Sequence, residues 1–313
     1  MSGKHIPVLN GYEWRKPPTD IEWHYIINQV KYVEDMLQKG TLAYDESIDQ
    51  TIKLLAQYYR NYKQLQKSEC EDIIAAYIVD YYVRIYGAEP LGLESTLLKA
   101  VKAACSNKKY TNCHGYKPLR DFDGVSVTAK EIDTIKQLES LPEQELLFCI
   151  LCFAKMYDET NRLHNRKVNH LYYVSGDVLR RCAGWKRGYE DKLTAAMTHL
   201  FDLGLVSNIN NRDKYGFLAP NRQPILTYKC NIVDDDDDDG EQVLFVDNFD
   251  TLSLTWQYIL GDKHIKKCEC GRYFKANSNS QKRCPLCGGP KPKEHKPITR
   301  NGKHAMGKHK NNQ

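Results

Sequence analysis

Four cysteines with the spacing of metal ligands stand near the end of the chain: Cys268, Cys270, Cys284 and Cys287. Each pair is followed by a glycine, which permits the turn that directs backbone N–H groups at the sulfur atoms. Four thiolates around one tetrahedral ion are typical of zinc, and they leave no open position for a catalytic water. The pattern therefore predicts a structural Zn²⁺ ion in a zinc ribbon.

The spacing leaves alternatives for the ligand set. The first pair is one residue tighter than the usual two-residue spacing, so His264 or His295 could replace one thiol. An iron–sulfur cluster fits less well, because no third cysteine has the required spacing. Tyr273 and Phe274 follow the first pair and are expected to cover the site, so metal binding would supply the folding energy of this small unit.

The other seven of the 11 cysteines are scattered along the chain. An odd total argues against a secreted disulfide framework, and residues 1–16 contain no apolar stretch typical of a secretion signal. No run approaches the roughly 20 apolar residues of a membrane helix. We therefore expect a chain in a reducing compartment, without a membrane partner.

Charge is unevenly distributed along the chain. Residues 263–313 carry 14 Lys and Arg against 2 acids, and residues 161–230 carry 12 against 5. Residues 231–262 carry 10 acids and no Lys or Arg. Two basic blocks around an acidic spacer are typical of a chain that contacts polyanions with particular segments. A solvated tail and a solvated linker are the alternative interpretation.

The first 157 residues show helical periodicity. Capping boxes precede three of the expected helices: Thr19 with Glu22, Ser68 with Glu71, and Thr128 with Glu131. Gly40 and Gly87 are expected to end two of them. Residues 107–127 break the pattern and are expected to form a long connection, whereas the apolar run 146–156 predicts a buried helix.

After residue 160 the pattern changes to short helices and short β-like runs. A run at 171–174 precedes two helices, and three more runs follow at 205–209, 215–219 and 225–230. The order of helix, strand, two helices and hairpin resembles the winged-helix family over residues 142–233. The resemblance implies a second helix that lies in a major groove and a wing that contacts the backbone.

The winged-helix resemblance also implies a set of phosphate contacts, which position a nucleic acid without specifying its sequence. The candidates in this segment are Arg180, Arg181, Lys186, Arg187, Lys192, Arg212 and Lys214. The second helix departs from the pattern, because its outward face carries Asp191 and Asp202 and is poor in Arg and Asn. Acids on that face are repelled by DNA, so a protein-binding module is the competing interpretation.

An acidic run, Asp234 to Asp239, follows the predicted wing. Six adjacent carboxylates repel one another and keep the backbone extended, which is typical of a solvated loop. The alternative is a polyanion mimic that covers a basic surface of this chain or of a partner.

The segment from Leu244 onward, with Lys-Cys-Glu-Cys-Gly-Arg-Tyr-Phe and then Lys-Arg-Cys-Pro-Leu-Cys, resembles the C-terminal ribbon of uncharacterised proteins. These proteins are carried by bacteriophages and mobile elements of Gram-positive bacteria. The resemblance covers the chain loosely, with the ribbon as its distinctive part. It implies a location in the cytoplasm of a bacterial host.

Together these observations predict a mainly α (α+β) chain in five parts. They are a helical domain (1–130), a winged-helix-like domain (131–233), an acidic linker (234–242), a strand and helix with the zinc ribbon (243–289), and a disordered basic tail (290–313). The tail adds the phosphate contacts Lys291, Lys293 and Lys296.

The sequence contains no phosphate loop, dinucleotide fingerprint, nucleophile elbow or His-Glu-x-x-His helix. The predicted function is therefore a non-enzymatic, nucleic-acid-binding regulator, with DNA favoured over RNA. The alternative is an adaptor or inhibitor that binds a host nucleic-acid-binding protein.

Overall fold

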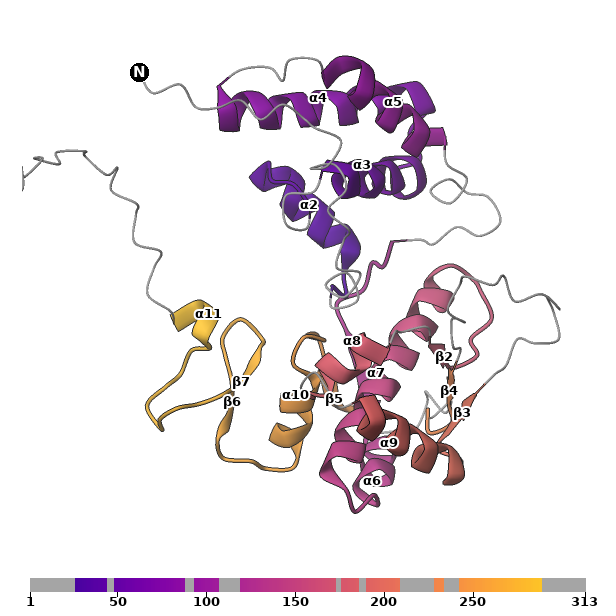
Figure 1. The fold of residues 1–313 in the computed structure, drawn as a ribbon, viewed down its shortest axis with the longest axis vertical. Helices are drawn as coiled ribbons and strands as arrows, with labels where there is room; N and C mark the ends of the chain where they lie inside the picture. Colours follow the sequence, from indigo (N-terminus) through magenta and orange to yellow (C-terminus); the bar gives the residue numbers. More distant parts are fainter. Residues whose placement is uncertain are drawn as a thin grey trace, which may run out of the picture.

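The computed structural model describes residues 26–43, 48–87, 93–106, 119–172, 176–185, 190–208, 228–233 and 242–288. Helices dominate these ranges, as the sequence predicts, and Figure 1 shows the four N-terminal ones gathered at the top of the view. The described buried residues form two large hydrophobic clusters. We call them the N-terminal core, which extends from Val30 to Leu119, and the central core, which is built chiefly from residues 125–256.

The N-terminal core is enclosed by helices. They are α2 (Gln29–Lys39), α3 (Ile48–Gln57), a π-helical turn η2 (Tyr58–Tyr62), α4 (Lys67–Tyr86) and α5 (Leu93–Ser106). Both predicted stops are confirmed: Gly40 and Gly87 follow α2 and α4 with φ of +61° and +76°. The predicted capping box of Ser68 and Glu71 is wrong, because the N-cap of α4 is Gln66, two residues before Ser68. The predicted box at Thr19 lies outside the described residues.

The central core is built around one long helix. It begins with β1 (Val125–Thr128) and α6 (Ala129–Lys136), which starts at the predicted capping box of Thr128 and Glu131. The long helix α7 (Leu141–Leu163) contains the predicted buried run, in which nearly every side chain from 146 to 156 has no exposed surface. Glu131 is itself buried and pairs with Lys155 of α7 at 2.8 Å. This ion pair fixes α6 against α7.

A three-stranded antiparallel sheet and two short helices lie against α7. In chain order they are β2 (Leu171–Tyr172), α8 (Gly176–Cys182), α9 (Glu190–Asp202), β3 (Val206–Asn208) and β4 (Tyr228–Cys230). The strand order across the sheet is β2-β4-β3, so the last strand lies between the other two. Gly184 and Gly204 follow the two helices with positive φ values of +72° and +70°. The predicted run 215–219 lies outside the described residues.

A strand and a helix from beyond the acidic run complete the central core. Strand β5 (Gln242–Val246) pairs antiparallel with β1, and α10 (Leu252–Ile259) packs on α7. Trp256 of α10 is fully buried, and its ring lies 5.2 Å from that of Phe148. Strand β1 falls in the predicted connection 107–127, and β5 and α10 fall in the predicted C-terminal part. The structure instead packs all three with the middle of the chain, because their apolar side chains enter the same core.

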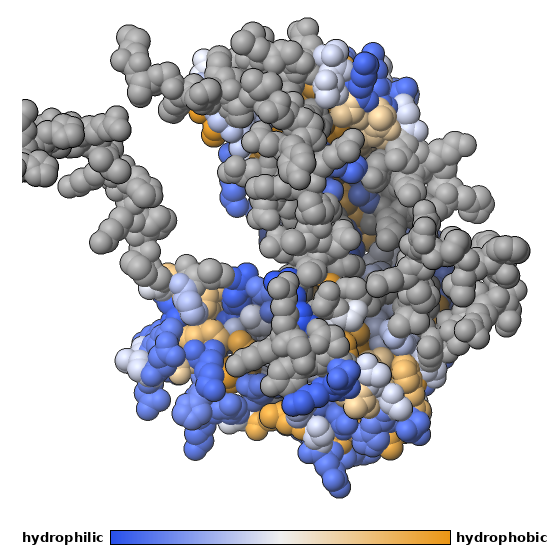
Figure 2. Space-filling model, viewed as in Figure 1, coloured by the Kyte–Doolittle hydropathy of each residue, from blue (hydrophilic) through white to orange (hydrophobic). Residues whose placement is uncertain are grey.

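The last described elements form a small unit beside α10. They are β6 (Ile265–Lys267), β7 (Tyr273–Lys275) and the short helix α11 (Pro285–Gly288). We call residues 262–288 the cysteine-rich unit. Its ring pair Tyr258–Tyr273, 5.0 Å apart, and its ion pair Arg272–Asp250, at 2.8 Å, attach it to α10 and the turn before it. Figure 2 shows hydrophilic side chains projecting from the lower left of the view, where Figure 1 places β6 and β7.

Candidate metal centre and basic surfaces

The first cysteine pair lies in the turn between β6 and β7. The strands pair Lys267 with Tyr273, so the five residues between them must reverse the chain. Gly271 has a φ of +84°, a backbone conformation that favours glycine, and its N–H donates to the carbonyl of Cys268 at 3.0 Å. The tight spacing of Cys268 and Cys270 therefore fits a short hairpin turn.

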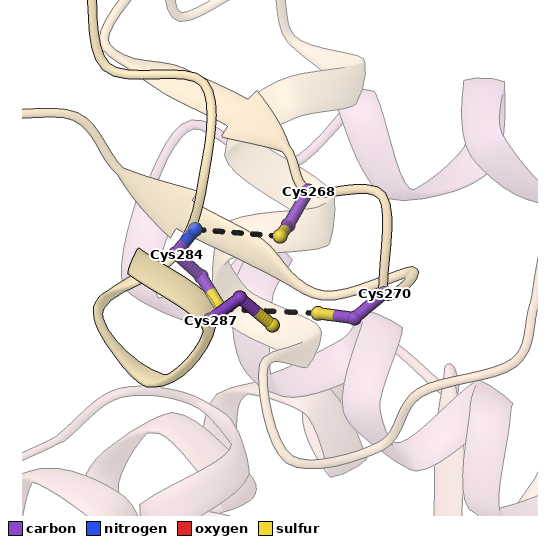
Figure 3. A group of neighbouring side chains, drawn as sticks. All are labelled: Cys268, Cys270, Cys284 and Cys287. Carbon is purple, nitrogen blue, oxygen red and sulfur yellow. Dashed lines mark hydrogen bonds between the residues drawn. The ribbon is translucent and has the colours of Figure 1, made fainter. Parts of the chain in front are cut away.

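The second cysteine pair lies at α11. The N–H groups of Cys287 and Gly288 both donate to the carbonyl of Cys284, at 3.1 and 2.8 Å. This single turn brings the two thiols, three positions apart, to the same side of the backbone. Figure 3 shows the thiols of both pairs converging on the space between the hairpin turn and α11.

The four sulfur atoms lie within 4.8 Å of one another, so they form a group that can hold a metal ion. The sulfur atoms of Cys270 and Cys284 are 3.8 Å apart. That separation matches the roughly 3.8 Å between sulfur atoms bound to a tetrahedral ion at about 2.3 Å. All ten described cysteines are free thiols. His264, the alternative ligand, is not a member of this group, and His295 lies outside the described residues.

Two thiols of this group, Cys268 and Cys287, have pKa values that are shifted in opposite directions. Backbone N–H groups of Cys270 and Cys284 donate to the sulfur of Cys268 and lower its pKa to about 6. The thiol of Cys287 is hydrogen-bonded to Cys270 and Cys284, and its pKa is raised to about 12. Without a cation, Cys268 therefore ionises far more readily than Cys287, which keeps its proton. A bound cation favours ionisation of all four.

The metal-ligand group supplies most of the local core. Cys268 and Cys284 are buried, with 3% and 1% of their surface exposed, whereas Cys270 and Cys287 are exposed. Phe274 is the third buried member of the cluster and covers the cysteines, as the sequence predicts. Tyr273 is buried as well, but its ring packs on Tyr258 of α10 and it is not a member of the cluster. Two of the three clustered residues belong to the group that can hold a metal ion, so the same side chains serve packing and metal coordination.

The structure describes three of the predicted phosphate contacts. Arg181 on α8 and Lys192 on α9 are exposed. Arg180 differs from the prediction: it is 6% exposed, and its Nη1 donates to the carbonyl of Trp185 at 3.1 Å. The guanidinium is bound to the turn that follows α8 and is not available to a phosphate. The other candidates lie outside the described residues: Lys186, Arg187, Arg212, Lys214, Lys291, Lys293 and Lys296.

The exposed side of α9 carries more acid than base, as the sequence indicates. Asp191 and Asp202 are exposed, and Lys192 is the one Lys or Arg of this helix. His199 is exposed as well, and its Nδ1 lies 3.0 Å from a carboxylate oxygen of Glu143. The helix that the winged-helix resemblance places in a major groove therefore presents carboxylates on its accessible surface. The predicted acidic run itself lies outside the described residues.

Three basic side chains of the cysteine-rich unit are not distinguished by the sequence pattern: Lys266, Lys282 and Arg283. In the sequence all three contribute to the net positive charge of residues 263–313. The polar run between the two cysteine pairs was the signal that could have indicated a loop with its own hydrogen bonds. The ammonium of Lys266 donates to the backbone carbonyls of Ser278, Asn279 and Gln281. Lys282 and Arg283 are exposed at the end of that loop.

No protein-family model, curated protein or solved structure matches this chain. Within the described ranges, no helix has both the length and the apolar character that crossing a bilayer requires.

Proposed function

We propose that this chain is a non-enzymatic, zinc-containing regulator that binds nucleic acid in the cytoplasm of a bacterial host. Zinc is the metal proposed for the four cysteines, because a closed tetrahedral set of four thiolates is typical of structural zinc. The 3.8 Å separation of Cys270 and Cys284 supports this assignment. The ion would stabilise the fold of the cysteine-rich unit and would take no part in a reaction.

The observation that carries nucleic-acid binding is the charge of the cysteine-rich unit. Residues 262–288 contain seven Lys and Arg and two acids. Four thiolates and one Zn²⁺ add a formal charge of about −2, which leaves the unit positive. A compact positive unit followed by further basic residues favours a polyanionic partner, because each neutralised phosphate releases counterions.

A winged-helix arrangement is proposed for α7 to β4. Two features support it: the element order α7-β2-α8-α9-β3-β4 and the sheet order β2-β4-β3, in which the second hairpin strand lies beside β2. Arg181 and Lys192 are the described phosphate contacts in this proposal. The acids on α9 make a deep major-groove contact by that helix unfavourable. We therefore assign the principal phosphate contacts to the cysteine-rich unit.

Fluorescence anisotropy with a labelled DNA duplex and a labelled single-stranded RNA, at about 50 and 200 mM salt, tests the proposal. Affinity is expected to fall about tenfold between the two salt concentrations if two phosphates are neutralised, and more if further contacts form. The duplex is expected to bind more tightly than the RNA. Absence of binding to either nucleic acid at the lower salt concentration would reject the proposal.

A second proposed function is binding to a host nucleic-acid-binding protein, as an adaptor or inhibitor. The exposed carboxylates of α9 favour it, and the acidic run 234–239 would extend the imitation of nucleic acid. A pull-down from the host, with and without nuclease, separates the two functions. This alternative requires a partner that survives nuclease treatment and no intrinsic affinity for DNA or RNA.

A further inference from the structure

A groove of about 640 Å³ opens beside the second cysteine pair. Its walls include Asn277, Ser280, Gln281, Lys282 and Arg283, all from the loop between β7 and α11. It ends at Gly288, one residue after a metal ligand. The groove is therefore a feature of the cysteine-rich unit, and its lining residues all come from the segment between β7 and the end of α11.

The loop that lines the groove is held in one shape by two side chains. The ammonium of Lys266 lies 3.3 Å from the carbonyl of Ser278 and 3.1 Å from that of Gln281, and it also contacts the carbonyl of Asn279. The amide of Gln281 accepts from the N–H of Asn277 at 2.8 Å and donates to the carbonyl of Arg283 at 3.1 Å. The loop is thus organised before any ligand arrives, which lowers the entropy cost of binding.

The groups that the groove presents suit an anion with several acceptor oxygens. Lys282 and Arg283 supply charge, and the Arg283 guanidinium can form two parallel hydrogen bonds to one phosphate. Asn277 and Ser280 supply neutral donors at the same wall. One acid, Glu269, approaches this wall, and its carboxylate lies 3.4 Å from Nη2 of Arg283. Both side chains of that pair are mostly exposed, 80% for Glu269 and 61% for Arg283, so the pair is weak and yields to a phosphate.

We propose that this groove binds a phosphate group of a nucleic-acid backbone through Lys282 and Arg283, and that Glu269 competes for Arg283. The proposal rests on the proposed function and locates one phosphate contact surface within it. A phosphate contact adds affinity and salt dependence without sequence preference. The groove therefore contributes to the affinity for nucleic acid, and other residues would determine any sequence preference.

The test compares three variants of the full-length, zinc-loaded chain. The groove variant is Lys282→Gln with Arg283→Gln. The charge-matched control is Lys263→Gln with Lys275→Gln, since both lysines are exposed on the same unit and neither lines the groove. The third variant, Glu269→Gln, removes the competing carboxylate. Zinc content of each variant verifies that the unit is folded.

The groove variant is expected to bind the DNA duplex about tenfold more weakly and to lose about 1.8 from the slope of log affinity against log salt, about 0.9 for each phosphate. The control is expected to lose distinctly less duplex affinity and less of the salt slope than the groove variant. Glu269→Gln is expected to bind more tightly than the unmodified chain. Two results would overturn the proposal for the groove while leaving the proposed function in place. One is an equal loss of duplex affinity in the groove variant and the control, and the other is weaker duplex binding by Glu269→Gln.

Failure of the proposed function has a different signature, because the unmodified chain would then bind no nucleic acid at all. A further measurement repeats the duplex titration with millimolar inorganic phosphate at constant ionic strength. Duplex binding that persists supports a backbone phosphate as the ligand. Displacement of the duplex from the unmodified chain, with the groove variant insensitive, would assign the groove to free phosphate and overturn the proposal.

Discussion

Individual cysteines occupy two unlike environments in this chain. Cys149 and Cys152 are fully buried in the central core, and burial raises the pKa of both thiols well above the ordinary value. These thiols pack as small apolar groups and are poor nucleophiles. Cys268 has a pKa near 6 because backbone N–H groups surround its sulfur. Local spacing was enough to predict which cysteines cluster, since ligand pairs are formed by single turns.

Replacing one exposed ligand tests the metal centre. Loss of a hydrogen bond that supports a metal ligand typically lowers metal affinity about 10- to 100-fold. Cys270→Ser removes a ligand itself, so it is expected to lower zinc affinity by more than this. Cys270 is exposed, so the change removes a ligand without opening a core cavity. Zinc released per chain, measured with a colorimetric chelator, gives the result. Cys182→Ala serves as the control and should retain one zinc, because Cys182 lies in the central core.

Glu145 gives a pH-dependent prediction. Burial raises its pKa above the ordinary 4.5, against the lowering effect of a hydrogen bond from Gln257. The folded state therefore binds more protons than the unfolded chain between the two pKa values, and stability falls as pH rises through that window. Glu145→Gln is expected to raise Tm at pH 7, with the gain fading as the pH falls toward 4.5. The exposed Glu139→Gln should change Tm little at either pH, and a Glu145→Gln gain independent of pH would contradict the assignment.

At the scale of elements, the sequence predicted what local interactions determine. The helix ends at Gly40 and Gly87 and the start at Thr128 depend on neighbouring residues, so they were found. Strand β1 was missed because its partner β5 lies about 120 residues further along the chain, where Val125 faces Val246. Arg180 was assigned to a phosphate because sequence does not tell which face of a seven-residue helix is covered.

The start of α6 combines two interactions of different strength. Thr128→Ala removes a helix cap and is expected to cost about 1 kcal/mol of unfolding free energy. Glu131→Gln is expected to cost about 3–5 kcal/mol, because the Lys155 ammonium, which is 14% exposed, would lose the buried carboxylate that lies 2.8 Å from it. Urea unfolding followed by tryptophan fluorescence measures both. Thr134→Ala, on the outer side of the same helix, should stay within about 0.5 kcal/mol, and similar losses in all three variants would contradict this ranking.

At the scale of the whole molecule, the two large cores and the metal centre have separate sources of stability. The N-terminal and central cores each bury many apolar side chains, and neither includes a metal ligand. The cysteine-rich unit has a cluster of three buried residues, two of which are ligands. Composition could predict this contrast, because residues 262–288 contain few apolar side chains. The attachment of the unit to α10 could not be predicted, since Tyr258–Tyr273 and Asp250–Arg272 are tertiary contacts.

Metal removal should therefore act on one part of the molecule. Structural zinc contributes about 10–16 kcal/mol in small zinc units, which is more than three clustered residues can replace. After treatment with a strong chelator, hydrogen exchange is expected to become fast in residues 262–288 and to stay slow in α7. Zinc added back should restore protection. Persistent protection of residues 262–288 in metal-free protein would contradict the dependence on metal.

The pairing of β1 with β5 determines where the central core can be separated from the rest of the chain. A fragment cut at residues 131 and 233 would lose both strands and α10, and it would expose Phe148 and Phe153 where Trp256 and Phe249 now cover them. A fragment of residues 119–260 would keep every one of these contacts. Strand β1 would begin six residues from one end of this fragment, and β5, which pairs with it, would finish 14 residues before the other end. A module excised from a longer chain keeps its core only when both strands of such a pair are carried with it, however far apart they stand in the sequence.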